Sequence, residues 1–265
     1  MVSEIIKIGR NFWNIRASFK MCGILDVGTQ ASLIKCKDGS FVLLDTCKMS
    51  EDTLVELDKL TLNGDLLKAI INLHPFHTAS VSEVHKLYPT AELYGTERHK
   101  LVLPDLPWQE MNSEDDALHQ HFAQDFDFLV PEGVDFVSDN DNVHFSSVLV
   151  YHKASKTIHV DDTLMFVPMP KLIGALGMKN ALSFHPTLTL ALEKHPDAAF
   201  EFEEWVNNLV DRWGGAKNIC AAHSANLIDD GEGKSVPERI LKALKNVKWI
   251  LIAHRLRYGY SGSRT

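Results

Sequence analysis

The stretch KAIINLHPFH, residues 68–77, joins an apolar run to two histidines that stand three positions apart. The run predicts a buried strand, and Pro75 marks a turn after it. His74 and His77 would then follow the C-terminal end of a strand, where the functional groups of α/β sheets collect. The pair is either a turn that contains histidine or one half of a metal site. Only the rest of the chain can decide between the two.

Two segments far apart in the chain share one pattern of strand, turn and strand. They are ASLIKCKDGSFVLLDT, residues 31–46, and SSVLVYHKASKTIHVDDT, residues 146–163. Each has an aliphatic run, a polar turn and a second run that ends in Asp-Thr, which predicts a β-hairpin. This internal similarity predicts two structural halves, each with a carboxylate at the end of a strand.

Helical patterns lie between and after these hairpins. Ser50 precedes acidic residues and leucines at helical spacing, which predicts the start of a helix. Further helices are expected at residues 79–89, near 186–195, at 198–213 and at 235–247, and further strands at 66–73, 91–95 and 216–223. Residues 100–130 have no regular pattern, and we expect a long irregular insertion there, near a site. Sheets with helices on their outer faces predict a layered α/β protein, here a single domain over residues 1–265.

The composition narrows the class of protein. The chain has 265 residues and a net charge of -8, with no block of Lys or Arg, which argues against a nucleic-acid partner. No stretch reaches the roughly 18 apolar residues of a membrane span, and the charged N-terminus is not typical of a signal peptide. The four cysteines have no short paired spacing, which favours reduced thiols over a disulfide framework; they are Cys22, Cys36, Cys47 and Cys220. We therefore expect a cytoplasmic protein with a small-molecule substrate and no membrane partner, and a homodimer is left open.

The polar residues at the predicted strand ends include five ordinary metal ligands. They come from four separate loops and are His74, His77, His144, Asp162 and His223. Asp45, Asn72 and Asp161 stand at strand ends as well. Imidazole and carboxylate together suit zinc, iron or manganese. The wider sequence therefore favours the metal-site interpretation of the histidine pair.

This arrangement resembles the metallo-β-lactamase-fold hydrolases over residues 20–225. That superfamily has a four-layer αββα sandwich of two similar halves, so the resemblance implies the same α/β fold here. Its His-x-His-x-Asp-His motif falls on residues 72–77. The resemblance implies that His144 is the distal histidine, Asp162 the bridging carboxylate and His223 the last histidine. It also implies a structural role beside the site for Asp45.

The chain departs from the family's pattern at three positions. Asn72 replaces the first histidine of the motif, Phe76 replaces its aspartate, and Asp161 stands where a glycine is usual. Because Phe76 removes a normal ligand of the second metal, the resemblance implies one zinc ion, with two as the alternative. Asn72 would add a weak oxygen ligand or hydrogen-bond the bound water.

The other histidines have simpler interpretations. His119 and His121 form a His-x-His pair, but two positions apart on a helix they would face different directions. We expect both to be solvated residues or part of a lid. The same interpretation is given to His85, His99, His152, His159, His185, His195 and His254.

The leading functional hypothesis is a zinc-dependent hydrolase of a small hydrophobic electrophile. Zinc lowers the pKa of its bound water to about 7, so hydroxide is available at neutral pH. Asp162 or Asp161 would move protons. The predicted substrate contacts are Phe76, Asn72, Trp13 and Met165. Trp13 is included because an N-terminal hairpin overhangs the site in this fold.

Within the superfamily, the overall sequence is most similar to the small bacterial isothiocyanate hydrolases, including the stretch RNFWNIRASFKMCGILDVGTQASL at residues 10–33. The resemblance implies detoxification of an isothiocyanate, which hydroxide at the metal converts to an amine and carbonyl sulfide. Lactonases and thioesterases of the same fold are alternatives, but their signature has the histidine and aspartate that are missing at positions 72 and 76. A non-catalytic metal-binding or scaffold protein with a degenerate site is the alternative from another class.

Overall fold

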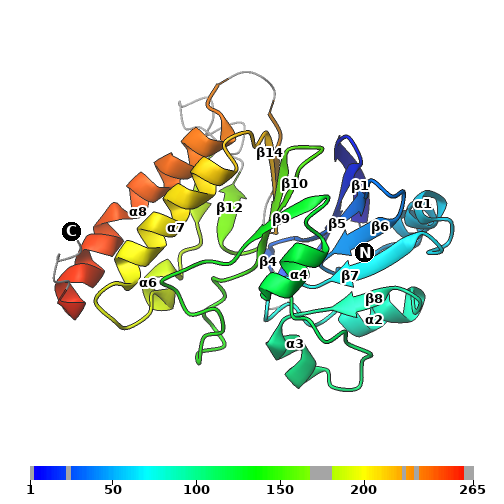
Figure 1. Ribbon diagram of the computed structural model, residues 1–265, viewed down its shortest axis with the longest axis horizontal. Helices are drawn as coiled ribbons and strands as arrows, with labels where there is room; N and C mark the ends of the chain where they lie inside the picture. The colour runs from blue at the N-terminus through cyan, green and yellow to red at the C-terminus, as the bar shows by residue number, and fades with distance from the viewer. Residues whose placement is uncertain (1–2, 22–24, 168–180, 223–224, 230–232, 260–265) are drawn as a thin grey trace.

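The computed structural model describes residues 3–21, 25–167, 181–222, 225–229 and 233–259. Within these ranges two β-sheets stack face to face, and helices cover the outer face of each sheet (Figure 1). This is the four-layer αββα sandwich that the sequence predicts.

The first sheet is built from the N-terminal part of the chain and has the strand order β1-β2-β5-β6-β7-β8. Its strands are β1 (Ser3–Gly9), β2 (Phe12–Ala17), β5 (Thr29–Lys35), β6 (Phe41–Leu44), β7 (Leu67–Ile71) and β8 (Glu92–Tyr94). The β6–β7 and β7–β8 pairs are parallel, and the other neighbours are antiparallel.

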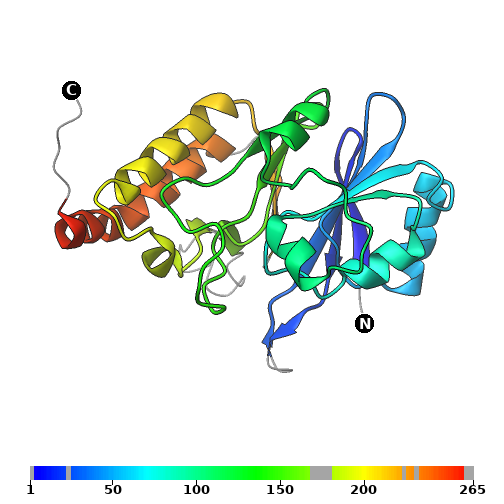
Figure 2. The ribbon, with the colours of Figure 1, turned by 60° about the horizontal axis from the view of Figure 1, so that its bottom comes forward.

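The second sheet has the strand order β15-β14-β11-β10-β9. Its strands are β9 (Phe126–Leu129), β10 (Leu149–His152), β11 (Thr157–Val160), β14 (Asn218–Ala221) and β15 (Asn226–Leu227). Two small strand pairs lie outside both sheets: β3 (Lys20–Met21) with β4 (Leu25–Asp26), and β12 (Leu164–Val167) with β13 (Ala181–Phe184). The β3–β4 pair extends away from the body of the molecule (Figure 2).

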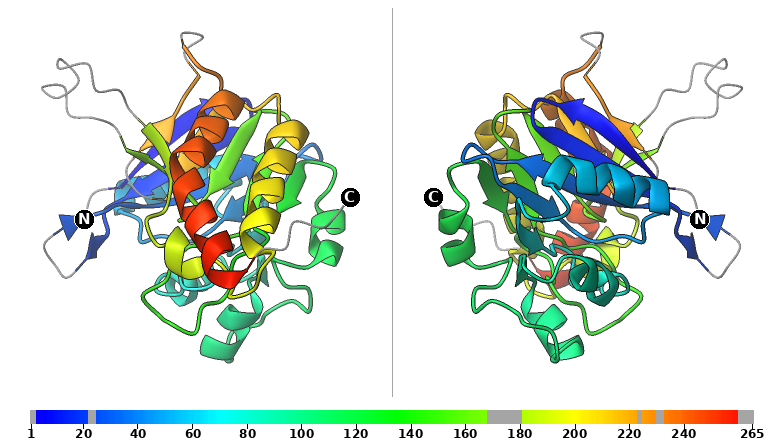
Figure 3. Two further views of the ribbon diagram at one scale, coloured as in Figure 1. Left: turned by 90° about the vertical axis from the view of Figure 1, so that its left-hand side faces the viewer. Right: turned by 90° about the vertical axis from the view of Figure 1, so that its right-hand side faces the viewer.

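Helices cover both outer faces. They are α1 (Glu51–Thr61), α2 (Val81–Leu87), α3 (Glu97–Val102), α4 (Asp116–His121), α6 (Leu188–Ala191), α7 (Ala198–Arg212) and α8 (Val236–Tyr258). Helix α4 packs through Leu118 against the cluster of buried apolar side chains between the sheets. Helices α7 and α8 lie side by side over the second sheet, and α1 lies at the opposite end of the molecule (Figure 3). Among the described residues, no helix has the length and apolar character needed to cross a bilayer.

Local sequence signals explain where the main helices begin. The Ser50 side chain accepts a hydrogen bond from the backbone N–H of Thr53, and two acidic residues occupy the first turn of α1. Helix α8 begins with a capping box between Ser235 and Glu238. The expected irregular insertion at residues 100–130 is wrong in part, because α3 ends and α4 and β9 lie within it.

The two predicted hairpins are confirmed, and they occupy equivalent places in the two sheets. Strands β5 and β6 form the first hairpin, and β10 and β11 form the second. The second strand of each hairpin then pairs in parallel with a later strand, β6 with β7 and β11 with β14. Parallel neighbours end at the same edge of a sheet. The loops after β6, β7, β11 and β14 therefore start at corresponding edges of the sandwich.

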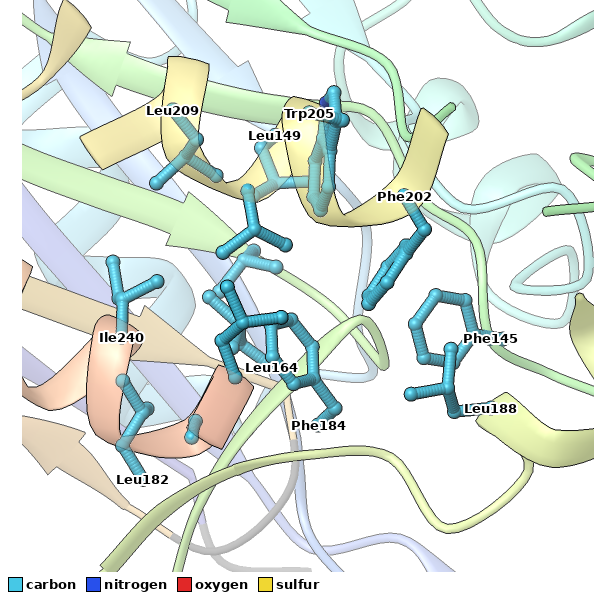
Figure 4. Packing of buried hydrophobic residues seen from close by; sticks show 14 of the residues in the cluster. Phe145, Leu149, Leu164, Leu182, Phe184, Leu188, Phe202, Trp205, Leu209 and Ile240 are labelled. Carbon is cyan, nitrogen blue, oxygen red and sulfur yellow. The ribbon is translucent and has the colours of Figure 1, made fainter. Parts of the chain in front are cut away.

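Three clusters of buried apolar side chains hold the layers together. One cluster joins α1 and α2 to the first sheet, one fills the space between the sheets, and one joins α7 and α8 to the second sheet. In the last cluster, Phe202 and Trp205 of α7 pack near Leu149 and Leu164 (Figure 4). Burial of large side chains of this kind is the main favourable term in folding.

Candidate metal centre

Two histidines and one carboxylate from different sheets converge at the edge of the sandwich. His74 and His77 follow β7 in the first sheet, and Asp162 follows β11 in the second sheet. One ligand atom from each of the three lies within 4.8 Å of the others. His74 Nε2 is 3.2 Å from Asp162 Oδ2, and His77 Nε2 is 3.5 Å from the same oxygen. The sequence motif and the repeated hairpin therefore meet in space.

The backbone around the histidine pair is fixed by a buried carboxylate. Asp45, at the end of β6, accepts a hydrogen bond of 2.7 Å from the backbone N–H of Leu73. Asp45 has a φ of 56°, a left-handed conformation that turns its side chain at the strand end. The rings of His74 and His77 then stack with centroids 3.9 Å apart. This supports the structural role predicted for Asp45.

The two stacked histidines have opposite pKa shifts. Burial, together with the charge of His77, lowers the pKa of His74 to about 4. Burial also opposes protonation of His77, but the carboxylates of Asp161 and Asp162 outweigh it and raise the pKa of His77 well above its usual range. At neutral pH, His74 is neutral and His77 carries a proton that a metal ion would have to displace.

The donor atoms fit a metal ion such as zinc. His74 Nε2 is buried and has no hydrogen bond of acceptable geometry, so it is an unused donor that faces Asp162. Two imidazole nitrogens and a carboxylate oxygen are ordinary zinc ligands. One contact opposes this fit, because the backbone N–H of Phe76 donates to His74 Nδ1 at 3.2 Å. That contact places the ring proton on Nε2, and a metal at Nε2 would require the proton to move to Nδ1.

His144 lies beside this group but is not part of it as placed. Its ring centroid is 5.9 Å from that of His74, and its Nε2 donates to the backbone carbonyl of Asp141. With Nε2 held by that carbonyl, His144 would bind a metal through Nδ1. The ligand role of His144 stays a prediction. His223, the fifth predicted ligand, lies outside the described residues.

Asn72 is buried between neighbouring strand ends. The side chain is fully buried, its oxygen accepts from the Thr46 hydroxyl at 3.2 Å, and its nitrogen donates to the Tyr94 carbonyl at 3.0 Å. Both ends of the amide therefore hold neighbouring strand ends together. Its predicted contact with a metal-bound water or a substrate stays a prediction.

The prediction that Trp13 in the N-terminal hairpin contacts the substrate is wrong. Along β2, Phe12 and Asn14 are buried on the face toward the second sheet, whereas Trp13 points to the opposite face and packs against Phe41, with ring centroids 6.1 Å apart. Side chains alternate along a strand, so Trp13 cannot reach the metal-ligand group. Met165 lies half-buried in β12, three positions after Asp162, and its substrate contact stays a prediction.

Phe76 lies beside the group, with its ring centroid 6.1 Å from that of His74, and it contacts the guanidinium of Arg98. Its ring stacks on His144 with centroids 4.6 Å apart, and the Arg98 guanidinium carbon lies 4.2 Å from the ring centroid. Arg98 also donates to the Pro75 carbonyl at 3.0 Å and lies 3.6 Å from an oxygen of Asp141. No sequence motif marked Arg98. It adds a positive charge to a rim that the sequence predicts to be largely apolar.

His159 is a buried residue that the sequence interpretation missed. Its Nε2 is 2.8 Å from Asp45 Oδ2, and its Nδ1 is 2.9 Å from the hydroxyl of Ser32 on the first sheet. Burial, with the nearby charge of Asp161, raises the pKa of Asp45 to about 6. The period-2 alternation of β11, which puts His159 on the same face as Asp161, was the available signal. A surface role for His159 is therefore wrong.

The remaining histidines are not members of this group, although His99 Nε2 lies 3.4 Å from the backbone carbonyl oxygen of His77. His119 on α4 is hydrogen-bonded through Nε2 to the Ser113 carbonyl and stacks on Phe128, so it is less solvated than expected. The expectation of solvated positions is wrong for four others, which are buried: His85, His99, His152 and His254. A separate group of one histidine and two glutamates lies near the surface at α7 and is formed by Glu193, His195 and Glu201.

Comparisons with known proteins agree with the architecture. No protein-family model matches the sequence, and no curated protein sequence matches it significantly. Among solved structures, the DIM-1 metallo-β-lactamase exposed to ceftazidime aligns with a TM-score of 0.60 at 13% identity, over 92% of this chain and 97% of that chain. A metallo-β-lactamase from Erythrobacter litoralis, with β-mercaptoethanol in its active site, aligns with a TM-score of 0.60 at 13% identity, over 92% and 96% of the two chains.

A third neighbour is the metallo-β-lactamase FIM-1 from Pseudomonas aeruginosa in its mono-zinc form. It aligns with a TM-score of 0.57 at 11% identity, over 93% of this chain and 96% of that chain. Identities this low establish the shared architecture and nothing finer. This chain therefore has the metallo-β-lactamase fold.

Proposed function

We propose that this protein is a metal-dependent hydrolase, with zinc as the metal. The observation that supports this most directly is the convergence of His74, His77 and Asp162 from two sheets onto one point. The fold places that point at the ends of strands, where metallo-β-lactamase-fold proteins would be expected to act on a substrate. His144 and His223 are proposed to complete the ligand set.

The three converging side chains would hold the metal, and the surrounding residues would keep them in place. When bound, zinc lowers the pKa of a bound water and polarises the group under attack. Asp162 is buried and faces both histidines, so its role is to bind rather than to carry protons to solvent. Asp45 holds the backbone that presents His74.

For the substrate, we propose a small hydrophobic electrophile, and specifically an isothiocyanate that reacts with water to give an amine and carbonyl sulfide. The half-buried Phe76 ring beside the metal-ligand group supports an apolar substrate, as does the overall sequence resemblance. Arg98 favours a second candidate, because lactonases and thioesterases release a carboxylate that a guanidinium could hold.

Metal content and turnover together test this proposal. The protein would be purified with added zinc and assayed for metal by elemental analysis, and about one zinc per chain is expected. It would then be incubated with phenethyl isothiocyanate, a thioester, a lactone and a β-lactam. Zinc-dependent loss of the isothiocyanate with release of amine would support the specific substrate. A zinc-loaded protein that turns over none of them would favour the non-catalytic alternative.

A further inference from the structure

We propose that Asp161 is a positioning residue, which holds the Nδ1–H of His77 so that His77 Nε2 faces the point shared with His74 and Asp162. This inference rests on the proposed metal-binding function. It also reassigns Asp161, which the sequence suggested as a carrier of protons during catalysis.

The two neighbouring carboxylates contact different nitrogens of one ring. Asp161 Oδ2 lies 3.0 Å from His77 Nδ1, whereas Asp162 Oδ2 lies 3.5 Å from His77 Nε2 and 3.2 Å from His74 Nε2. A neutral imidazole carries one proton, so donation from Nδ1 to Asp161 leaves the Nε2 lone pair for a metal. Carboxylates that hold the second nitrogen of a ligand histidine commonly fix its tautomer and ring orientation in this way.

Asp161 is poorly placed to exchange protons with a substrate or with water. It is buried, and its second oxygen, Oδ1, lies 3.4 Å from the side-chain nitrogen of Gln30. Gln30 is itself held by the Val160 and Cys220 carbonyls at 2.9 and 3.0 Å. Both oxygens of Asp161 are therefore directed at protein groups, one of which belongs to the first sheet.

His77 needs such support more than His74 does. The His77 side chain is 24% exposed and lies in a loop after Pro75, whereas His74 is fully buried. The family resemblance places a glycine at position 161, which could not hold an imidazole. Asp161 in this chain supplies His77 with a carboxylate partner at Nδ1.

Zinc affinity and the tautomer of His77 test the inference without measuring turnover. Zinc dissociation constants would be measured by competition with a chromophoric chelator for wild type, Asp161→Ala and Asp161→Asn. We expect Asp161→Ala to weaken binding about 10- to 100-fold. Asp161→Asn should recover part of the loss, because an amide oxygen still accepts from Nδ1–H. The matched control is Asp125→Asn, a buried carboxylate that accepts a backbone N–H from Lys37 far from the site, and its zinc affinity should equal wild type.

Long-range ¹H–¹⁵N spectra of the imidazole rings give the second measurement, with His77 assigned by comparison with His77→Gln. In the zinc-loaded wild type, His77 should be protonated on Nδ1. A folded Asp161→Ala with wild-type zinc affinity would overturn the inference and leave the proposed function standing. If that variant does not fold, a zinc-loaded wild type with His77 protonated on Nε2 would overturn it instead. A wild type that takes up no zinc would overturn the proposed function, and the inference with it.

Discussion

At the scale of single residues, the site depends on two stacked rings that differ in protonation. His74 is kept neutral by burial, with a pKa of about 4, while the flanking carboxylates raise the pKa of His77. The same carboxylates that would support a metal therefore hold a proton where the metal would bind. Metal and proton compete for His77 and not for His74.

This competition predicts a pH dependence of zinc binding. Because the pKa of His77 is raised, its proton is present at neutral pH and is lost only as the pH rises. Zinc affinity should therefore increase with pH, by up to about tenfold per unit for one displaced proton, until the pH reaches the pKa of His77. Calorimetric titrations in buffers of different ionisation enthalpy would show about one proton released per zinc. Binding that is independent of pH between 6 and 8 would contradict this assignment.

A second prediction at this scale distinguishes His144, which we expect to bind the metal, from His119, which we do not. His144→Ala should weaken zinc binding, because its ring lies beside His74 and its Nε2 is held by the Asp141 carbonyl, which leaves Nδ1 to bind the metal. His119→Ala should leave zinc affinity unchanged, since that ring stacks on Phe128 near α4. Chelator competition on both variants checks this. Loss of the metal in the His119 variant alone would reverse the assignment.

At the scale of elements, the second half depends on α7 for its core. Trp205 is buried under α7, and it packs near Phe202 with ring centroids 5.7 Å apart. Trp205→Ala should lower the free energy of unfolding by about 3–5 kcal/mol, as large truncations in a core do. Trp249 on α8 is 67% exposed, so Trp249→Ala should change the free energy of unfolding by less than about 0.5 kcal/mol. Urea denaturation of both variants gives the comparison, and equal effects would contradict the packing described.

Elements with a strong local signal were predictable from the sequence, and elements defined by tertiary contacts were not. The Ser50 cap, the two Asp-Thr hairpins and the amphipathic α7 all follow from spacing and residue type. Helices α3 and α4 are too short for an apolar period to emerge, so their segment seemed irregular. The phase of β2 was also ambiguous, because hydrophobic residues occupy both of its faces. The sequence therefore could not place Trp13.

The residues of the site, like the elements of the fold, were predictable only in part. His74, His77 and Asp162 were found because each follows a strand end. His159 was missed because a polar residue in an alternating strand is expected to face solvent, whereas both faces of β11 are buried.

At the scale of the whole molecule, a half-buried arginine ties the two sheets together. Arg16 on β2 donates to the Ala221 carbonyl and, at 3.1 Å, to the Ala222 carbonyl at the end of β14. Arg16→Met would leave both carbonyls without this donor and should lower the free energy of unfolding by about 2–4 kcal/mol. The exposed Arg10→Met is the control, and urea denaturation the measurement. A variant as stable as wild type would show that water replaces the guanidinium.

The metal-ligand group lies between a loop of the first sheet and a loop of the second. Metal binding should therefore stabilise the contact between the two sheets. A ligand that binds only when both loops are docked stabilises the docked state by mass action. At free zinc about 100 times the dissociation constant, that stabilisation is about 2.7 kcal/mol. Calorimetric scans should therefore show a melting temperature that rises with zinc concentration, whereas the rise should be much smaller for Asp162→Ala, which removes a buried ligand that the second sheet contributes. On this basis the metal would act as a reversible cross-link between the two halves. A chelator would then lower the stability of the fold as well as remove the metal.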